Sequence, residues 1–386
     1  MSNMLQINNA QVLLDSNFTK ANLLINDGVI ADISTSAIRS EVIKIVDASD
    51  LFVVPGFIDI HMHGAMGIDI TNADINGLST ISEFVAYYGT TAWVASIISE
   101  TEEITKRCID TILAFMQSNY SGAELLGIHL EGPFLNKELA GAMSPHLLRK
   151  GDLSLFERLR ERAGDALKYI TLAPEVEGVA EMICTIAKSG VRVSMGHTNA
   201  DYSLTMRCIK DGVTGVTHTF NAMRLFHQHE PAVMGAALES DIYCEAICDG
   251  FHLHPGSVRM LLKAKGYDRV IAVTDSTMAA GMPDGIHKIG DKEIIVENGD
   301  AKLVENGVRA GSTLTSLKAL HNLQAFTGEP VEKLSALLSA NPAKFIGLSD
   351  RKGSISKGFD ADIVILDKNS NLTMTIAGGR IVYEKR

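Results

Sequence analysis

The sequence predicts an α/β protein in which a (β/α)8 TIM barrel is flanked by a small β-sandwich built from both chain ends. Eight near-continuous apolar runs alternate with stretches of helical periodicity, which is typical of parallel strands covered on both faces. All eight runs fall within residues 52–347, and eight such units favour a closed barrel over an open sheet. Short alternating runs broken by turns occupy both ends of the chain, as in antiparallel strands.

Residues 1–51 are expected to form the first part of the β-sandwich. Their alternating runs LQINNAQVLL and ANLLINDGVIADI include NDG, which is typical of a hairpin turn. Segments of helical periodicity, such as SLFERLRERAGDAL and VAEMICTIAKSG, lie between the apolar runs of residues 52–347. Barrel strands are expected at the apolar runs 52–60, 91–99, 124–130, 169–174, 191–196, 213–220, 242–248 and 269–274.

The segment after the eighth run, GIHKIGDKEIIVENGDAKLVENG, is expected to form a β-hairpin insertion. Two helical stretches follow it, TSLKALHNLQAF and VEKLSALLSANPAKFIG. Residues 348–386 then return to short strands and turns. They are expected to supply the second part of the β-sandwich and to pair with the first.

Composition excludes several classes of function. The 386 residues are 46% apolar and 21% charged, which suits a large core rather than a disordered chain. The net charge of −11 argues against a nucleic-acid or anionic-membrane partner. There is no apolar run of transmembrane length, no basic and apolar leader, and no CxxC pair among the five cysteines. A cytoplasmic protein is therefore expected.

Ionisable side chains stand at the ends of the expected strands. The carboxyl ends of barrel strands converge on one mouth, and a strand period of two puts His61 and His63 on one face. A single histidine there would more often be a hydrogen-bonded core residue. Six such groups together would be costly to bury without a metal or mutual pairing. Imidazoles and carboxylates are the ligands of hydrolytic Zn, Fe and Mn sites. The six residues are His61, His63, Glu131, His197, His218 and Asp275.

Six sequence segments resemble the amidohydrolase superfamily and, within it, the N-acetylglucosamine-6-phosphate deacetylase family. They are HMHG after PGFID, HLEGPF, GHTNA, THTFNAM, DGFHLHP and VTDSTMAAGMPDG. The resemblance extends from the N-terminal β module to GSISKGFDADIVILD. It implies the metal-dependent amidohydrolase barrel and hydrolysis of N-acetylglucosamine 6-phosphate to glucosamine 6-phosphate and acetate, in amino-sugar catabolism. The galacto epimer stays open as an alternative substrate.

The resemblance also implies roles for individual residues. Glu131, His197 and His218 would bind one divalent metal ion, and His61 and His63 would allow a second. The metal would be Zn, Fe, Mn or a similar ion. Asp275 would be the catalytic acid and base, exchanging a proton with the attacking water and the leaving amine. The implied substrate contacts are Ala142, Asn221, Ala222, His252, Ala310, Gly311 and Ser312.

Two positions depart from the pattern of that family. Met143 stands where a histidine near the scissile amide is common, and methionine is not a strong hydrogen-bond donor. His229 stands where an arginine often reaches the phosphate of a neighbouring subunit, and we retain it as a substrate contact. Arg224 and His227 lie close by in the sequence. A homodimer with its phosphate site near the subunit interface is expected.

Three other readings share parts of this pattern. A cyclic amidase would usually carry a metal-bridging lysine at the end of the fourth strand, where this chain has Thr171, Leu172, Ala173 and Pro174. An adenosine-deaminase-like enzyme would show a HAGE-type helix, which is lacking here. A non-enzymatic scaffold would be expected to have lost ligands that this chain retains.

Overall fold

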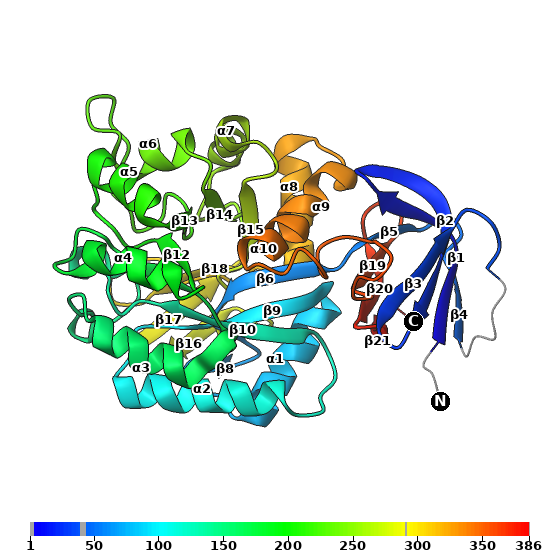
Figure 1. Cartoon of the computed structure of the whole chain (residues 1–386), viewed down its shortest axis with the longest axis horizontal. Helices are drawn as coiled ribbons and strands as arrows, with labels where there is room; N and C mark the ends of the chain where they lie inside the picture. Colours follow the sequence, from blue (N-terminus) through cyan, green and yellow to red (C-terminus); the bar gives the residue numbers. More distant parts are fainter. Residues whose placement is uncertain (1–3, 39–43, 290–291, 386) are drawn as a thin grey trace.

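The computed structural model describes residues 4–38, 44–289 and 292–385 and shows two joined parts (Figure 1). The larger part is a parallel barrel surrounded by helices, and the smaller part is a sheet that contains both chain ends. Both predicted features of the fold class are therefore confirmed. No helix in the described ranges is long and apolar enough to cross a membrane.

Eight parallel strands form the barrel. Each strand pairs with its neighbour in the order β15-β14-β13-β12-β11-β10-β9-β6. The end strands meet where Met62 bridges Ser276. The side chains of these strands are almost all buried, which explains their apolar character. The bounds are β6 (Phe57–Met62), β9 (Thr90–Ile97), β10 (Glu124–Glu131), β11 (Leu167–Leu172), β12 (Arg192–Met195), β13 (Val213–Val216), β14 (Tyr243–Ile247) and β15 (Val270–Val273).

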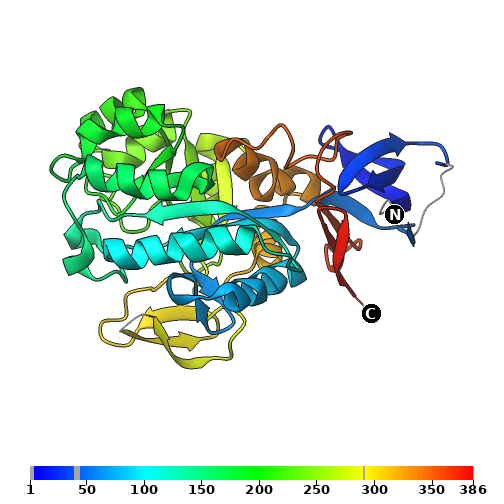
Figure 2. The same cartoon turned by 60° about the horizontal axis from the view of Figure 1, so that its bottom comes forward.

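Helices cover the outside of the barrel (Figures 1 and 2). Several begin at a side chain that accepts a hydrogen bond from the first turn, for example Asp74, Thr101 and Asp152. Their buried faces pack on strand residues such as Trp93, within one large apolar cluster. The helices are α1 (Ile75–Tyr87), α2 (Glu102–Met116), α3 (Leu153–Ala163), α4 (Val179–Lys188), α5 (Tyr202–Asp211), α6 (Ala232–Glu239), α7 (Pro255–Lys265), α8 (Ser316–Thr327), α9 (Val331–Leu338) and α10 (Ala340–Phe345).

The second sheet joins the two chain ends in the order β21-β20-β19-β5-β1-β2-β3, with β4 also paired to β1. Asp27 and Gly28 turn the chain between β2 and β3, as the NDG signal predicts. A separate apolar cluster fills this part, including Leu23, Val53 and Ile363. The strands are β1 (Met4–Leu14), β2 (Asn17–Asn26), β3 (Val29–Ser34), β4 (Lys44–Asp47), β5 (Phe52–Pro55), β19 (Ile363–Leu366), β20 (Leu372–Ala377) and β21 (Arg380–Glu384).

The run at 52–60, expected to be one strand, is two strands in different sheets. β5 pairs with β1 and β19, whereas β6 pairs with β9 in the barrel. Gly56 separates them, and a Cβ atom at this position would lie 2.1 Å from Thr91 Oγ1. The chain changes sheets here because only glycine permits that close approach.

The insertion after β15 contains one strand more than the expected hairpin. Its three antiparallel strands are β16 (Gly285–Ile289), β17 (Lys292–Glu297) and β18 (Asp300–Leu303). Figure 2 shows this sheet, in yellow, against one side of the barrel. The shorter elements are β7 (Gly64–Ala65), β8 (Ile68–Asp69), η1 (Ile70–Asn72), η2 (Lys137–Leu139), η3 (Pro145–Leu147) and η4 (Gly164–Ala166).

A buried lysine joins the barrel to the second sheet. The side chain of Lys352 is fully buried, and its Nζ lies 2.6 Å from Glu124 at the start of β10. The same nitrogen lies 2.6 Å from Asp362 and 2.8 Å from Asp360, beside β19. Burial alone lowers the pKa of Lys352, but Asp362 and Glu124 reverse this and raise it above its usual value. The lysine is therefore charged and paired.

Candidate metal centre

All six ionisable side chains predicted from the strand ends meet at the carboxyl end of the barrel. They form two groups whose ligand atoms lie within 4.8 Å of one another in each group. The first group comes from β6 and the end of β15. The second comes from the ends of β10, β12 and β13. The two groups are His61, His63 and Asp275, and Glu131, His197 and His218.

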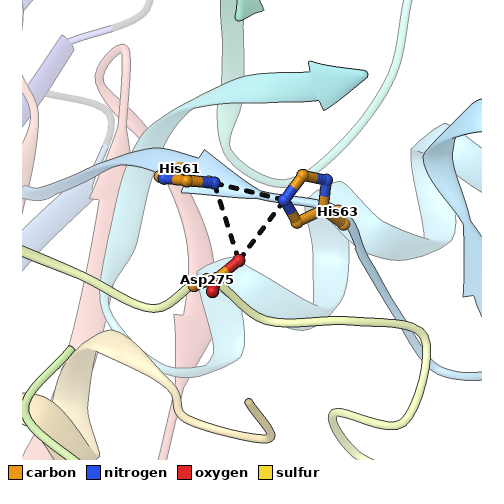
Figure 3. Close-up of side chains that lie close together, drawn as sticks. All are labelled: His61, His63 and Asp275. Carbon is orange, nitrogen blue, oxygen red and sulfur yellow. Dashed lines mark hydrogen bonds and ion pairs between the residues drawn. The ribbon is translucent and has the colours of Figure 1, made fainter. Parts of the chain in front are cut away.

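Figure 3 shows the first group, with its nitrogen and oxygen atoms pointing toward one another. The two Nε2 atoms of His61 and His63 are 3.1 Å apart. Asp275 Oδ1 lies 3.5 Å from the first of these nitrogens and 3.3 Å from the second. Three potential ligand atoms therefore face one small volume.

Glu131 contacts both groups. Its Oε1 lies 3.3 Å from His197 Nε2 and 3.1 Å from His218 Nε2. Its Oε2 lies 3.2 Å from His63 Nε2, and its Oε1 lies 3.5 Å from His61 Nε2. The carboxylate thus lies between the two groups, where it could contact an ion in either.

Hydrogen bonds at the outer ring nitrogens fix the tautomers of three histidines. His63 Nδ1 donates to Ser96 O over 3.2 Å, and His197 Nδ1 donates to Leu139 O over 2.6 Å. His61 Nδ1 donates to a carboxylate oxygen of Glu245 over 2.9 Å. Because these acceptors carry no proton, each neutral ring has its proton on Nδ1 and a lone pair on Nε2. With both rings neutral, the two Nε2 lone pairs would face each other across 3.1 Å and repel, so the site requires a positive charge there, either a proton or a metal ion.

The electrostatics of the ion-free site also favour a cation. Burial lowers the pKa of His61, but Glu245, Asp275 and Glu131 reverse this and raise it to about 9. Burial raises the pKa of Glu131, but the imidazole rings of His197, His218 and His61 beside it hold it well below its usual value. The donor set of imidazole nitrogens and carboxylate oxygens is suited to Zn, Fe or Mn.

Three of these residues have an unusual backbone conformation. His197, His218 and Asp275 have φ angles of 47°, 31° and 49°, in the left-handed region that non-glycine residues seldom adopt. Each such residue costs on the order of 1–3 kcal/mol, and such residues cluster at functional sites. The strand ends therefore keep a strained conformation that directs these side chains inward.

A cavity of about 750 Å³ opens over the two groups. Among the expected substrate contacts, Ser312 does not line it, because its Oγ donates to Thr274 O over 2.5 Å behind the wall. Met143, the departure near the amide position, does line it. The expected contacts that line the cavity are Ala142, Asn221, Ala222, His252, Ala310 and Gly311.

His229 lies outside the lining of this cavity. It stands on an exposed loop beside His227, with ring centroids 5.4 Å apart. Arg224 on the same loop forms an ion pair with Glu230. The structure of a single chain therefore does not bring His229 together with the other predicted contacts.

Sequence analysis missed four residues that contact the site. Lys137, Lys292 and Arg309 line the cavity. Lys292 begins β17 of the inserted sheet, and Arg309 lies in the segment that follows β18. Nothing in the local sequence indicates where the insertion packs, so the sequence gives no indication that Lys292 and Arg309 line the cavity. Glu245 had one: it is a lone carboxylate within the apolar run IYCEAIC.

Comparisons with known proteins agree with this geometry. The sequence model of the amidohydrolase family matches residues 52–382, and the chain belongs to that family. An N-acetylglucosamine-6-phosphate deacetylase of Bacillus subtilis (strain 168) is 37% identical over 364 residues, covering 93% of this chain and 92% of the relative.

Two solved structures are similar over nearly the whole chain. N-acetylglucosamine-6-phosphate deacetylase from Pasteurella multocida has a TM-score of 0.93 and 28% identity, covering 99% of this chain and 100% of that one. An enzyme of the same name from Mycobacterium smegmatis, in complex with N-acetyl-D-glucosamine-6-phosphate, has a TM-score of 0.90 and 28% identity, covering 99% of both chains.

Proposed function

We propose that this chain is a metal-dependent deacetylase that hydrolyses N-acetylglucosamine 6-phosphate to glucosamine 6-phosphate and acetate. The observation that carries this proposal is the meeting of six predicted ligand and acid-base groups beneath one cavity. The names of the relatives supply the substrate. The galacto epimer is the second candidate, since the two sugars differ at one hydroxyl group.

Asp275 is the proposed acid and base. Its carboxylate lines the cavity beside His63. Burial raises its pKa, but His61 and His63 reverse this and hold it below its usual value, so the group is ionised at neutral pH. It can therefore accept a proton from the attacking water and return it to the departing amine.

The metal, when bound, lowers the pKa of water and polarises the amide carbonyl. Glu131, His197 and His218 would hold one ion, and His61 and His63 with Asp275 would hold a second. We propose two ions for each chain because both groups show the same convergence of ligand atoms. Zn, Fe and Mn all suit these ligands.

The cavity wall beside Asp275 is formed by the main chain at Gly311, where there is no room for a side chain. Gly311 has a φ of 58°, and a Cβ atom there would lie 2.4 Å from Thr277 Cγ2 and 2.8 Å from Asp275 O. Its neighbour Ala310 also lines the cavity. We propose that the sugar ring packs against this main chain, with Asn221 and the backbone of Ala222 facing it.

The cavity also contains cations for a phosphate group. Lys292 Nζ lies 3.8 Å from Glu305, which is a weak pairing, whereas Arg309 forms two hydrogen bonds with Asp300 at 2.8 and 3.0 Å. Lys137 also lines the cavity. We propose that Lys292 and Lys137 offset the net charge of −11 and attract the sugar phosphate.

A homodimer would give His229 a role. The loop that carries it exposes Leu225 and Phe226, which are 81% and 55% exposed. Apolar side chains so exposed and adjacent are typical of contact surfaces. We propose that this loop packs on a second chain and brings His229 to the phosphate end of that chain's cavity.

We place the enzyme in the cytoplasm, because its five cysteines are free thiols.

Acetate release tests the proposed function directly. Purified enzyme would be supplied with N-acetylglucosamine 6-phosphate, N-acetylgalactosamine 6-phosphate and both unphosphorylated sugars. We expect the highest kcat/KM with the first compound. A higher kcat/KM with N-acetylgalactosamine 6-phosphate would make that sugar the substrate. Equal kcat/KM values with the unphosphorylated sugars would show that the enzyme does not recognise the phosphate group. No acetate from any of them would reject deacetylation.

A further inference from the structure

Glu245 lies beneath the metal centre, on the barrel strand β14, and is 2% exposed. Its Oε2 accepts a hydrogen bond from His61 Nδ1 over 2.9 Å and from the backbone N–H of His218 over 3.1 Å. Its Oε1 accepts from the hydroxyl group of Tyr169 over 3.1 Å. One buried carboxylate therefore contacts a residue of each ligand group.

His61 differs from the other ligand histidines in its outer partner. His63 and His197 donate their Nδ1 protons to the backbone carbonyls of Ser96 and Leu139. His61 donates to a full carboxylate, which fixes the tautomer and increases the basicity of Nε2 more than a carbonyl does. In the described part of the chain, the buried Nδ1 of His218 has no hydrogen-bond partner.

We propose that Glu245 is a positioning residue that enables the His61, His63 and Asp275 group to bind its own metal ion. The inference rests on the proposed function only in taking the two ligand groups to be metal sites. Glu245 holds the His61 ring with its Nε2 lone pair toward Asp275 and supplies the negative charge that strengthens this ligand. Glu245 contacts the second group only through the backbone N–H of His218. We therefore expect that group to need an acceptor of the size of Glu245 but not the negative charge of Glu245.

The substitution Glu245→Gln separates charge from shape. Glutamine has the same size, and its carbonyl oxygen can still accept hydrogen bonds from His61 Nδ1 and the His218 amide. Tyr169→Phe is the matched control, because it removes the hydrogen bonds of the Tyr169 hydroxyl group to the other carboxylate oxygen and to Ile60 O and leaves the His61 contact in place. Phenylalanine also preserves the ring stacking on His129, where the centroids are 3.8 Å apart.

Metal binding would be measured without substrate, by metal analysis of the purified protein and by competition of the metal-free protein with a chromogenic chelator for Zn²⁺. We expect the wild-type protein and Tyr169→Phe to bind two ions. We expect Glu245→Gln to bind one ion with unchanged affinity and the other about 10–100-fold more weakly, the usual effect of losing such a partner. Circular dichroism of the metal-free variants would confirm that they fold.

Three results would overturn the inference: a single ion in the wild-type protein, unchanged affinity in Glu245→Gln, or equal weakening at both sites. Should Glu245→Gln fail to fold, nitrogen NMR of the Zn²⁺-loaded wild-type protein decides. A proton on His61 Nδ1 supports the inference, and a proton on Nε2 rejects it. Because these measurements use no sugar, an enzyme that binds metal as described but releases no acetate would contradict the proposed function alone.

Discussion

The backbone N–H of Asp275 donates a hydrogen bond to the carbonyl oxygen of His61 over 2.8 Å. The two residues lie at the ends of β15 and β6, the strands at the two edges of the barrel sheet. His63 N donates to Ser276 O over 2.7 Å at the same seam. The hydrogen bonds that close the barrel therefore also bring His61, His63 and Asp275 together.

Removal of metal is expected to abolish acetate release. The attacking water needs its pKa lowered, and the six protein groups alone do not supply a Lewis acid. Activity would be assayed after exhaustive chelation and again after addition of Zn²⁺, Mn²⁺ or Fe²⁺, with Mg²⁺ as the control ion. Full activity in metal-free protein would contradict the proposed chemistry.

Metal affinity is expected to rise with pH between about 6.5 and 8.5. In the ion-free site the pKa of His61 is raised to about 9, chiefly by Glu245, against the lowering effect of burial. The ring is therefore protonated at pH 7, and an ion must displace that proton to bind. Calorimetric titration with Zn²⁺ in two buffers of different ionisation enthalpy would measure the protons released. The same heat in both buffers would show that none is displaced.

Asp275→Asn is expected to lower kcat by about 10²–10⁴, because the amide cannot accept a proton. Metal analysis should show the ion at the Glu131 group retained. The matched control is Asp69→Asn, on the same cavity, where an asparagine can still accept the hydrogen bond from Thr71 N. A loss of less than tenfold in Asp275→Asn would remove Asp275 from the proton transfer.

Gly311→Ala is expected to reduce both stability and activity. The positive φ costs an alanine roughly 1–2 kcal/mol, and its Cβ would also collide with Thr277 and the backbone of Asp275. Gly307→Ala is the control, since Gly307 lines the same cavity with a φ of 72° and has no atom within 4 Å of an added Cβ. Urea unfolding and kcat/KM would be compared. Equal behaviour of the two variants would show that the Thr277 contact is unimportant.

Lys292→Ala is expected to raise KM for the phosphorylated sugar about tenfold and to change kcat little, because a phosphate contact far from the amide contributes to binding alone. Lys288→Ala is the control, since Lys288 is on the same inserted sheet but does not line this cavity. Initial rates would be measured at several substrate concentrations. A sharp rise of KM in His229→Ala instead would assign the phosphate contact to the dimer loop.

The sequence predicted most of the site because its chemistry stands at strand ends. Glu131, His197 and Asp275 each directly follow an apolar run, and the barrel topology alone brings such positions together. Gly56 could not be recognised as a change of sheet, since its contact with Thr91 exists only after folding. Lys292 was missed for a similar reason: the docking of the inserted sheet depends on tertiary packing that no local periodicity records.

Strand β10 has a carboxylate at each end. Glu124 begins it and pairs with the buried Lys352, and Glu131 ends it between the two ligand groups. Shortening the chain at its C-terminal end, to prepare a smaller enzyme, would therefore remove the counter-charge of Glu124 and loosen the base of the strand that holds Glu131. The sheet built from both chain ends therefore helps to hold the strand that carries Glu131, and a truncated enzyme that lacks residues 348–386 would lose this support.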